Sequence, residues 1–338
     1  MKRKTRRGPL AFLLIGGLLW IALAGGAYTY YAYTKLPVAS LPLQFSIKSG
    51  SSLRGAAHQM AATGILRHPE AFVVLARLLN QSGNLKAGTY EIDRAVTPLE
   101  LLRKITEGDY AQAGITFVEG WTFKQMRKAL DDHKGSNHDS RDLSNAELLQ
   151  RLGIAEASPE GWFFPDTYFF STGTSDLRIL RRAHQLMKAH LSAQWDKRAA
   201  DVPLASPYEA LVLASIIEKE TAKADERPLI AAVFVNRLRM GMKLQTDPTV
   251  IYGIGNAFDG NLRRGDLTAD TPYNTYTRTG LPPTPIAMPG LASLAAALNP
   301  ARSEALYFVS KGDGSHQFSR SLGEHERAVT RYQKTGRR

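Results

Sequence analysis

Residues 206–221 read SPYEALVLASIIEKET, and this stretch predicts the central helix of a folded domain. Ser206 can accept hydrogen bonds from the first free backbone N–H groups, and Pro207 suits the first helical position. Eight apolar or small residues then follow in a row, at positions 210–217, so the helix has no clearly polar face. Such a helix is buried by its neighbours on every side.

Two carboxylates, Glu218 and Glu220, follow this apolar run. They lie about 200° apart around the helix axis, so they cannot both face one cleft. Burial on an apolar helix face disfavours the charged form of a carboxyl group and raises its pKa, which suits a general acid. Alternatively, both carboxylates pair with nearby basic side chains as a structural network. The residues alone leave open this alternative and the choice between the two glutamates.

The rest of this domain mixes helices with short strands. We expect a strand at 115–118, helices at 122–132, from 144, at 177–198 and at 227–240, and a hairpin formed by 306–309 and 316–318. Residues 242–290 are rich in Gly, Pro, Thr, Asp and Asn, which predicts a long irregular stretch. Such stretches inside a compact domain are usually functional or disordered.

A smaller module precedes this domain, at residues 44–108. Its pattern predicts a strand at 45–47, a helix capped by Ser51 or Ser52, a helix from Pro69, a strand at 88–92 and a helix that starts with a capping box at Thr97. The order is strand, helix, helix, strand, helix. The module is too small for an elaborate enzyme, and it is either a binding module or a packing subdomain without a ligand.

The net charge of +12, from 43 basic and 31 acidic residues, lies at the two ends of the chain. The first 69 residues hold nine Lys and Arg and no acid, and residues 327–338 hold five basic residues and no acid. The centre, 70–326, therefore carries 29 basic and 31 acidic residues, a net charge of −2. Nucleic-acid binders carry their basic surface on the folded domain, so nucleic acid is not expected as a partner.

The N-terminus predicts a membrane anchor. A basic tail, 1–8, precedes a transmembrane helix at 9–33 and an extended tether at 34–43. Five positive charges before the helix place the N-terminus in the cytoplasm and the remainder outside. The alternative is a cleaved secretory signal, because Ala22-Leu23-Ala24 is typical of a cleavage site.

Other chemistries have little support in the residues. The absence of cysteine excludes disulfides, thiol catalysis and Cys-ligated metals, and the eight histidines lack metal-ligand spacing, so we expect neither a metal nor a cofactor. Polar side chains in the irregular stretch suit hydrogen bonds to sugar hydroxyls, namely Gln245, Asp247, Asn274 and Tyr276. They are equally typical of turns. His316 can orient a substrate or be an ordinary surface histidine.

Several blocks resemble one family in its own order. They are EGWFFPDTY at 160–168, LASIIEKET at 213–221, VFVNRL at 233–238, LQTDPTVIYG at 244–253, YNTY at 273–276, GLPPTPI at 280–286 and GSHQF at 314–318. This pattern is similar to that of the endolytic murein transglycosylases, called MltG or YceG-like. The resemblance runs from the anchor to about residue 326.

The resemblance implies an α+β protein with a single transmembrane helix, a LysM-like βααβ subdomain at 44–108 and a YceG-like catalytic domain at 114–338. It implies a lytic transglycosylase, a lyase that cuts the β-1,4 bond after N-acetylmuramic acid inside peptidoglycan strands. Glu218 falls on the family's catalytic glutamate. It would protonate the leaving oxygen and then deprotonate the sugar's C6 hydroxyl, which leaves 1,6-anhydro ends. The expected substrate-binding residues are Gln245, Asp247, Asn274, Tyr276, Tyr168 and His316.

By the same resemblance, the enzyme sits in the cell inner membrane with its catalytic part in the periplasm. It would terminate nascent strands next to penicillin-binding proteins and the elongation machinery. Two alternatives remain: a non-catalytic glycan-binding or scaffold protein of the cell wall, and a conventional muramidase-type hydrolase.

Overall fold

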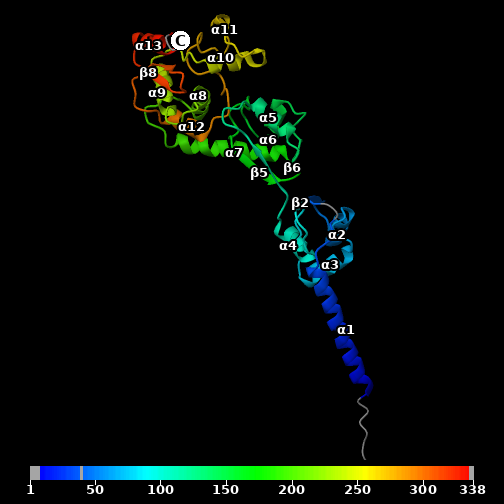
Figure 1. Cartoon of the computed structure of the whole chain (residues 1–338). Coiled ribbons are helices and arrows are strands. Elements are labelled where there is room, and N and C mark those ends of the chain that lie inside the picture. The colour runs from blue at the N-terminus through cyan, green and yellow to red at the C-terminus, as the bar shows by residue number, and fades with distance from the viewer. Residues whose placement is uncertain (1–7, 39–40, 335–338) are drawn as a thin grey trace, which may run out of the picture. The chain divides into compact units, whose positions relative to one another are not determined.

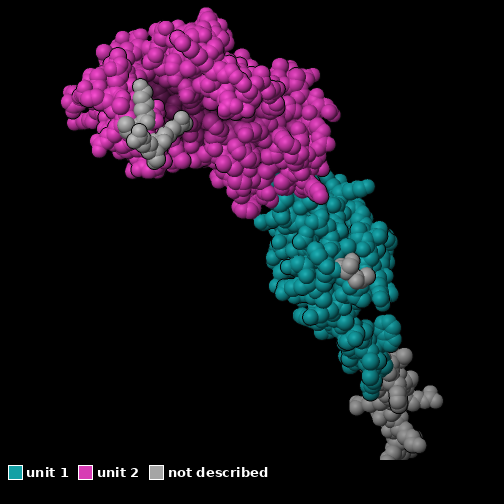
Figure 2. Space-filling view, turned by 45° about the horizontal axis from the view of Figure 1, so that its top comes forward, with its two compact units in different colours: residues 1–113, 170–173 teal, residues 114–169, 174–338 magenta. Residues whose placement is uncertain are grey.

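A computed structural model describes residues 8–38 and 41–334, with side chains from Ile15 to Gln333 within that range. The described chain forms two compact units (Figures 1 and 2). The first comprises residues up to 113 together with 170–173, and the second comprises 114–169 and 174 onward. The predicted basic tail lies outside the described residues except for Gly8.

Helix α1 (Gly8–Tyr33) covers the segment predicted to span a membrane. Its last turns pack against the remainder of the first unit, where the Tyr28 hydroxyl donates to the Ala71 carbonyl at 2.7 Å and Ala32 is buried. Within the described residues, no helix combines the length and apolar character that crossing a membrane requires.

The first unit has the predicted βααβ order. Strands β1 (Leu43–Ile47) and β2 (Gly88–Ile92) pair antiparallel, and helices α2 (Leu53–Ala62) and α3 (Pro69–Leu78) lie between them in the chain. Helix α4 (Pro98–Glu107) begins at the predicted capping box of Thr97 and Glu100, which is present in full. Both the element order and this helix start are confirmed.

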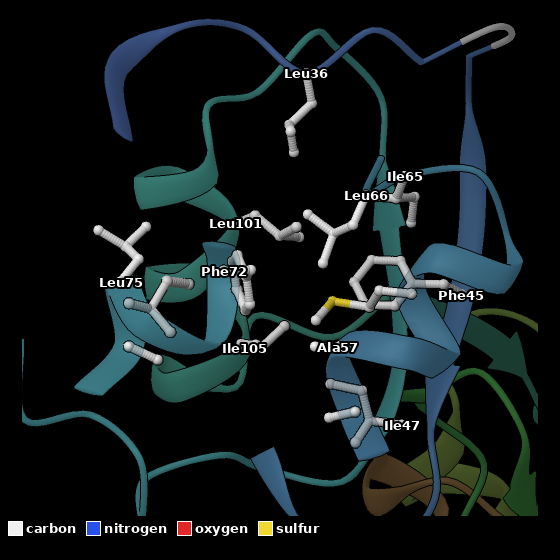
Figure 3. Close-up of a cluster of buried hydrophobic side chains, with 14 of the residues drawn as sticks. Leu36, Phe45, Ile47, Ala57, Ile65, Leu66, Phe72, Leu75, Leu101 and Ile105 are labelled. Atoms are coloured by element: carbon white, nitrogen blue, oxygen red, sulfur yellow. The ribbon is translucent and has the colours of Figure 1, made fainter. Parts of the chain in front are cut away.

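One hydrophobic core holds these elements together (Figure 3). Phe45 on β1 stacks on Tyr90 of β2 with ring centroids 5.3 Å apart. Phe72 and Leu101 bring α3 and α4 into the same cluster, and both are fully buried. Because each element contributes apolar side chains to it, this core accounts for a small unit that folds around its own centre.

The second unit is built around α8 (Pro207–Glu220). Helices α7 (Asp176–Trp195), α9 (Arg227–Arg239) and α12 (Leu291–Leu298) pack against it (Figure 1). Residues 210–217 are all buried, as the apolar run predicted. The prediction of a buried central helix is confirmed, and Ser206 caps it by accepting from the Glu209 N–H.

Short elements complete the second unit. The remaining described strands pair two by two: β3 (Gln112–Thr116) with β5 (Thr167–Ser171), β4 (Ser136–Asn137) with β6 (Thr174–Ser175), and β7 (Tyr307–Ser310) with β8 (His316–Ser319). Helices α5 (Phe123–Asp132) and α6 (Asn145–Leu152) precede β5, and α13 (Leu322–Val329) and η2 (Thr330–Lys334) follow β8. The predicted hairpin is β7 with β8, which pair antiparallel.

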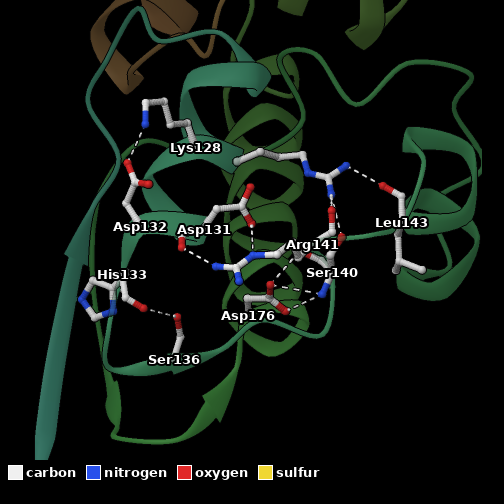
Figure 4. A network of polar contacts seen from close by, with 10 residues as sticks. Lys128, Asp131, Asp132, His133, Ser136, Ser140, Arg141, Leu143 and Asp176 are labelled. Atoms are coloured by element: carbon white, nitrogen blue, oxygen red, sulfur yellow. Dashed lines mark hydrogen bonds and ion pairs between the residues drawn. The ribbon is translucent and has the colours of Figure 1, made fainter.

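A polar network anchors the loop between α5 and α6 (Figure 4). Asp176, at the start of α7, is fully buried. Its carboxylate accepts from the Ser140 hydroxyl at 2.6 Å and from the Ser140 backbone N–H at 3.1 Å. Apart from the two residues of β4, segment 134–141 forms no regular element, and the buried Asp176 carboxylate ties it to the fold.

The prediction of an irregular stretch at 242–290 is wrong in part. The segment contains α10 (Asp247–Ile254), η1 (Gly255–Ala257) and α11 (Arg264–Thr268). One interpretation of Thr246-Asp247-Pro248 is a turn, but an acidic residue and a proline are also typical of the first turn of a helix. Here they begin α10.

Candidate functional site

The two glutamates at the end of α8 have different partners. Glu218 Oε1 accepts from Arg227 Nη2 at 3.2 Å, and its Oε2 accepts from the Gly290 backbone N–H at 2.9 Å. Only 5% of the Glu218 side chain is exposed, and 11% of that of Arg227. Glu218 is thus enclosed in an ion pair.

Glu119 lies beside this ion pair. Its Oε2 is 4.0 Å from Arg227 Nη2. A Cβ atom at Gly290 would lie 1.8 Å from Glu119 Oε1, so the absence of a side chain there makes room for the carboxylate. Burial and the charge of Glu218 raise the pKa of Glu119, and Arg227 opposes this shift. The surroundings of Glu218 are those of a packed ionic cluster.

Glu220 instead lines a cavity of about 460 Å³. The walls come from α8, α9, the segment that leads into α10, the turn that carries Tyr276, the hairpin of β7 and β8, and the C-terminal helices. They include Arg237, Leu244, Gln245, Thr246, Asp247, Tyr276, Tyr307, Phe308, His316, Leu322, His325, Val329 and Gln333. Glu220 Oε1 accepts a hydrogen bond from the Thr246 hydroxyl. This is the carboxylate of the pair that a ligand in the cavity would meet.

The environment of Glu220 makes it a candidate acid. Burial raises its pKa to about 6 and the charge of Asp247 adds to the shift, whereas the Thr246 hydrogen bond, His316 and Arg237 oppose it. A glutamate in this range exchanges protons near neutral pH, which general acid–base catalysis requires.

Arg237 places a positive charge at the same cavity. Its Nε donates to the Leu306 carbonyl at 2.7 Å and its Nη1 to the Leu244 carbonyl at 2.8 Å. The guanidinium also lies over the Tyr307 ring, 5.1 Å from the centroid. Because these contacts are to neutral groups, the charge of Arg237 remains available to stabilise a carboxylate at Glu220.

Four of the predicted substrate-binding residues line this cavity with Glu220: Gln245, Asp247, Tyr276 and His316. Gln245 has a φ of +50°, an unusual backbone conformation for a residue other than glycine. Its Oε1 accepts from Arg237 Nη1 at 3.4 Å. Residues far apart in the sequence are thus brought together around one carboxylate.

The structure places the other two predicted residues outside the cavity lining. Asn274 is buried, donates to the Ala269 carbonyl at 2.6 Å and accepts from the Tyr276 backbone N–H at 2.9 Å. It therefore holds the turn that presents Tyr276. The Tyr168 hydroxyl donates to the Phe164 carbonyl at 2.7 Å in a buried setting. Direct contact of either side chain with a sugar stays a prediction.

Sequence reasoning missed Glu226, which pairs with His316. The His316 Nδ1 is 2.6 Å from Glu226 Oε2. The two residues are 90 positions apart, and no spacing rule links such a pair, so the sequence held no signal for it. Thr246 was also missed, although it stands between two predicted site residues.

Metal ligation finds no support in the geometry. In the part of the chain with described side chains, no group of three or more His, Asp or Glu residues is arranged to hold a metal ion.

Comparisons with known proteins agree with one another. The model of the YceG-like family matches residues 45–331. A protein named endolytic murein transglycosylase from Bacillus subtilis (strain 168) is 31% identical over 330 residues, covering 92% of this chain and 91% of that protein. One of the same name from Streptococcus pneumoniae serotype 2 is 27% identical over 360 residues, covering 94% of this chain and 65% of that protein.

A solved structure is similar as well. The crystal structure of a YceG-like protein from Listeria monocytogenes matches with a TM-score of 0.54 and 29% identity, covering 84% of this chain and 98% of the other. The family model spans most of the chain, and a relative above 30% identity covers almost all of it. The chain belongs to the YceG-like family.

Proposed function

We propose that the protein is a lytic transglycosylase that cuts peptidoglycan strands internally, with Glu220 as its acid. Relatives named endolytic murein transglycosylase support the reaction class and the substrate. The observation that carries the choice of residue is the cavity in which Glu220, Gln245, Asp247 and Tyr276 meet.

Glu220 fits the acid role better than Glu218. An acid must hold its proton near neutral pH and must reach the substrate, and Glu220 has a pKa raised to about 6 by burial and lines the cavity. Glu218 is ion-paired to Arg227 at 3.2 Å and is not among the residues that line the cavity. The resemblance had implied Glu218; the geometry supports the other glutamate of the pair.

The reaction needs only one acid at the leaving group. Glu220 protonates the oxygen that bridges N-acetylmuramic acid to the next sugar, and the bond to the anomeric carbon breaks. The C6 hydroxyl of the same N-acetylmuramic acid attacks that carbon, loses its proton to a base in the site and closes a 1,6-anhydro ring. Conventional glycosidases use a second carboxylate for a water or a covalent intermediate, which this internal attack makes unnecessary.

The experiment compares two matched variants, Glu220→Gln and Glu218→Gln, on purified peptidoglycan with mass spectrometry of the products. We expect Glu220→Gln to lose about 10²–10⁴-fold of the rate of 1,6-anhydro end formation. Glu218→Gln keeps the reaction but lowers stability, because Arg227 loses its buried partner. Full activity of Glu220→Gln would contradict the proposal that Glu220 is the acid.

The products also separate the alternative functions. Reducing N-acetylmuramic acid ends in place of anhydro ends indicate a conventional muramidase-type hydrolase. Retained glycan binding without any cleavage indicates a binding or scaffold protein.

We also propose that α1 anchors the enzyme in the inner membrane, with the catalytic unit in the periplasm. Large apolar side chains of α1 are exposed, among them Leu18 at 66% and Trp20 at 76%, and five basic residues precede the helix. An exposed apolar helix next to a basic flank suits a lipid environment. Fractionation of cells that express the full chain tests this: recovery in the membrane fraction after a high-salt wash is expected, and release by salt contradicts it.

Two finer roles follow from the same family resemblance. The enzyme would terminate nascent glycan strands beside penicillin-binding proteins, and residues 44–108 would be a LysM-like module. Strand-length analysis in cells with Glu220→Gln tests the first, with longer strands expected. Binding of the full-length Glu220→Gln protein to insoluble peptidoglycan tests whether a non-cleaving enzyme still holds glycan.

A further inference from the structure

His316 and Glu226 form a buried pair at the cavity. Glu226 Oε2 lies 2.6 Å from His316 Nδ1, and Glu226 Oε1 accepts from the His316 backbone N–H at 2.9 Å. Only 12% of the His316 side chain and 11% of that of Glu226 are exposed. One carboxylate thus holds both the backbone and the ring of a single histidine.

This contact determines which ring nitrogen carries the proton. A carboxylate can only accept hydrogen bonds, so Nδ1 must be the donor. Burial acts to raise the pKa of Glu226, but the hydrogen bonds from His316 outweigh it and lower this pKa. Glu226 therefore accepts these bonds as a charged carboxylate. The neutral imidazole therefore has its lone pair on Nε2.

The ring is fixed with respect to the cavity that it lines. The Phe308 ring meets it edge to face, with centroids 5.4 Å apart, and the Phe318 ring is 6.5 Å away. Glu226 on one side and the two phenyl rings leave the ring little freedom to turn. A histidine that a carboxylate holds through Nδ1, so that Nε2 is the nitrogen left to take up a proton, is the arrangement of a general base.

We propose that His316 is the base of the reaction and that Glu226 is its positioning residue. Nε2 of His316 removes the proton of the attacking C6 hydroxyl while Glu220 gives its proton to the leaving oxygen. This inference rests on the proposed function of the Glu220 cavity, and it divides between two residues the acid and base steps that one glutamate would otherwise perform.

The step balances in atoms and charge. The bond from the anomeric carbon to the leaving oxygen breaks, and the bond from that carbon to O6 forms. One proton moves from O6 to His316, and one moves from Glu220 to the leaving oxygen. His316 then holds the extra proton and Glu220 has lost one, so a single proton transfer through solvent restores both groups.

The charges around the pair suit this division. The described ionisable groups that face His316 or share its cavity are Glu226, Glu220, Asp247, Arg237, Lys223, His325, Tyr276 and Tyr307. The charge of His316 acts to lower the pKa of Glu220, so a protonated His316 and a protonated Glu220 disfavour each other. Once His316 has taken a proton, the carboxylate that Glu220 becomes is stabilised.

The test uses the full-length protein with peptidoglycan as substrate and His316→Ala as the main variant. We expect a fall of about 10²–10⁴-fold in kcat, and partial recovery when free imidazole is added, because imidazole can occupy the vacated space and act as the base. His58→Gln, on an exposed histidine of the first unit, is the matched control and should keep full activity and gain nothing from imidazole.

Glu226→Gln tests the positioning role. An amide N–H₂ facing Nδ1 would favour the other tautomer, with the proton on Nε2, and would remove the lone pair from the cavity. We expect kcat to fall with KM little changed, and ¹⁵N spectra of histidine-labelled protein to report the change of tautomer. Glu226→Asp, which keeps the carboxylate, should recover part of kcat.

The outcomes separate this inference from the function on which it rests. If Glu220→Gln is inactive but His316→Ala keeps its kcat, His316 is not the base, while the proposed function stands. The same conclusion follows if folded His316→Ala, with an unchanged thermal midpoint, is inactive and imidazole restores nothing. If Glu220→Gln is fully active, the proposed function itself fails.

Discussion

The Tyr276 hydroxyl donates a hydrogen bond of 2.5 Å to Oδ1 of Asp247, and both side chains line the cavity that holds Glu220. This bond fixes the Asp247 carboxylate at the start of α10. From there, its negative charge raises the pKa of Glu220. The protonation of the proposed acid therefore depends on a neighbour that does not itself need to transfer a proton.

Replacing Asp247 by Asn should move the pH dependence of the reaction. Glu220 must be protonated to act as an acid, so kcat/KM falls as pH rises through its pKa. Without the charge of Asp247, that pKa is lower, and the falling limb moves to lower pH. The measurement is the pH profile of anhydro-end formation. Asp259→Asn, at an exposed ion pair outside the cavity lining, is the control, and an unmoved limb in Asp247→Asn would contradict the prediction.

Glu160 should make stability fall as pH rises. It is 5% exposed, accepts from the Phe123 N–H and the Tyr252 hydroxyl, and burial raises its pKa to about 7. Between about pH 4.5 and 7 the folded chain keeps a proton that the unfolded chain releases, so the free energy of unfolding decreases by up to about 3 kcal/mol across this window.

Urea unfolding at pH 5 and pH 8 checks this, with Glu160→Gln as the variant. The neutral amide cannot ionise, so its stability should change less between the two pH values. Glu304→Gln, at a largely exposed ion pair, should behave like the parent protein. Equal pH dependence in the parent and in Glu160→Gln would refute the assignment.

The buried carboxylate of Asp176 should be important for stability. Asp176→Ala leaves the Ser140 N–H and hydroxyl without their acceptor, and we expect a loss of about 3 kcal/mol or more. Ser140→Ala removes one of these bonds and should cost about 1–2 kcal/mol. Asp132→Asn, at an exposed pair with Lys128 in the same network, should change stability by less than about 1 kcal/mol. Chemical denaturation ranks the three, and a different order contradicts the prediction.

Replacement by alanine should lower stability by different amounts at two glycines. At Gly161 the φ is +82° and a Cβ would lie 2.6 Å from two atoms of the Pro285 ring, which cannot turn away, so we expect a loss of about 2–4 kcal/mol. At Gly290 the φ is −79°, and the clash is with the end of the half-exposed Glu119 side chain. Glu119 can rotate into solvent, so Gly290→Ala should cost about 1 kcal/mol or less. Thermal unfolding midpoints compare the two.

Local signals predicted much of the fold. The capping boxes at Thr97 and Ser144 and the cap at Ser206 each act within three residues, and each marks a helix start in the structure. The start of α10 was missed because Asp247 and Pro248 favour turns and helix starts alike. Local sequence propensity cannot distinguish a turn from a helix start here, because the packing of this segment on α8 decides which of the two forms.

The sequence identified individual residues of the site but not how they come together around the cavity. The helical period separated Glu218 from Glu220, but it could not tell which face would meet the cavity, because the walls come from segments between 237 and 333. The same holds for Glu226 and His316, which are 90 residues apart. Their contact depends on how the β7 and β8 hairpin packs beside the start of α9.

The last described elements of the chain, α13 and η2, also form part of the cavity wall, through Leu322, Val329 and Gln333. This has a practical consequence for protein production. A purification tag fused directly after η2 would begin close to Gln333, which lines the proposed active site. Preparations for kinetic work should carry their tags elsewhere or have them removed, or a steric artefact will be measured in place of the enzyme.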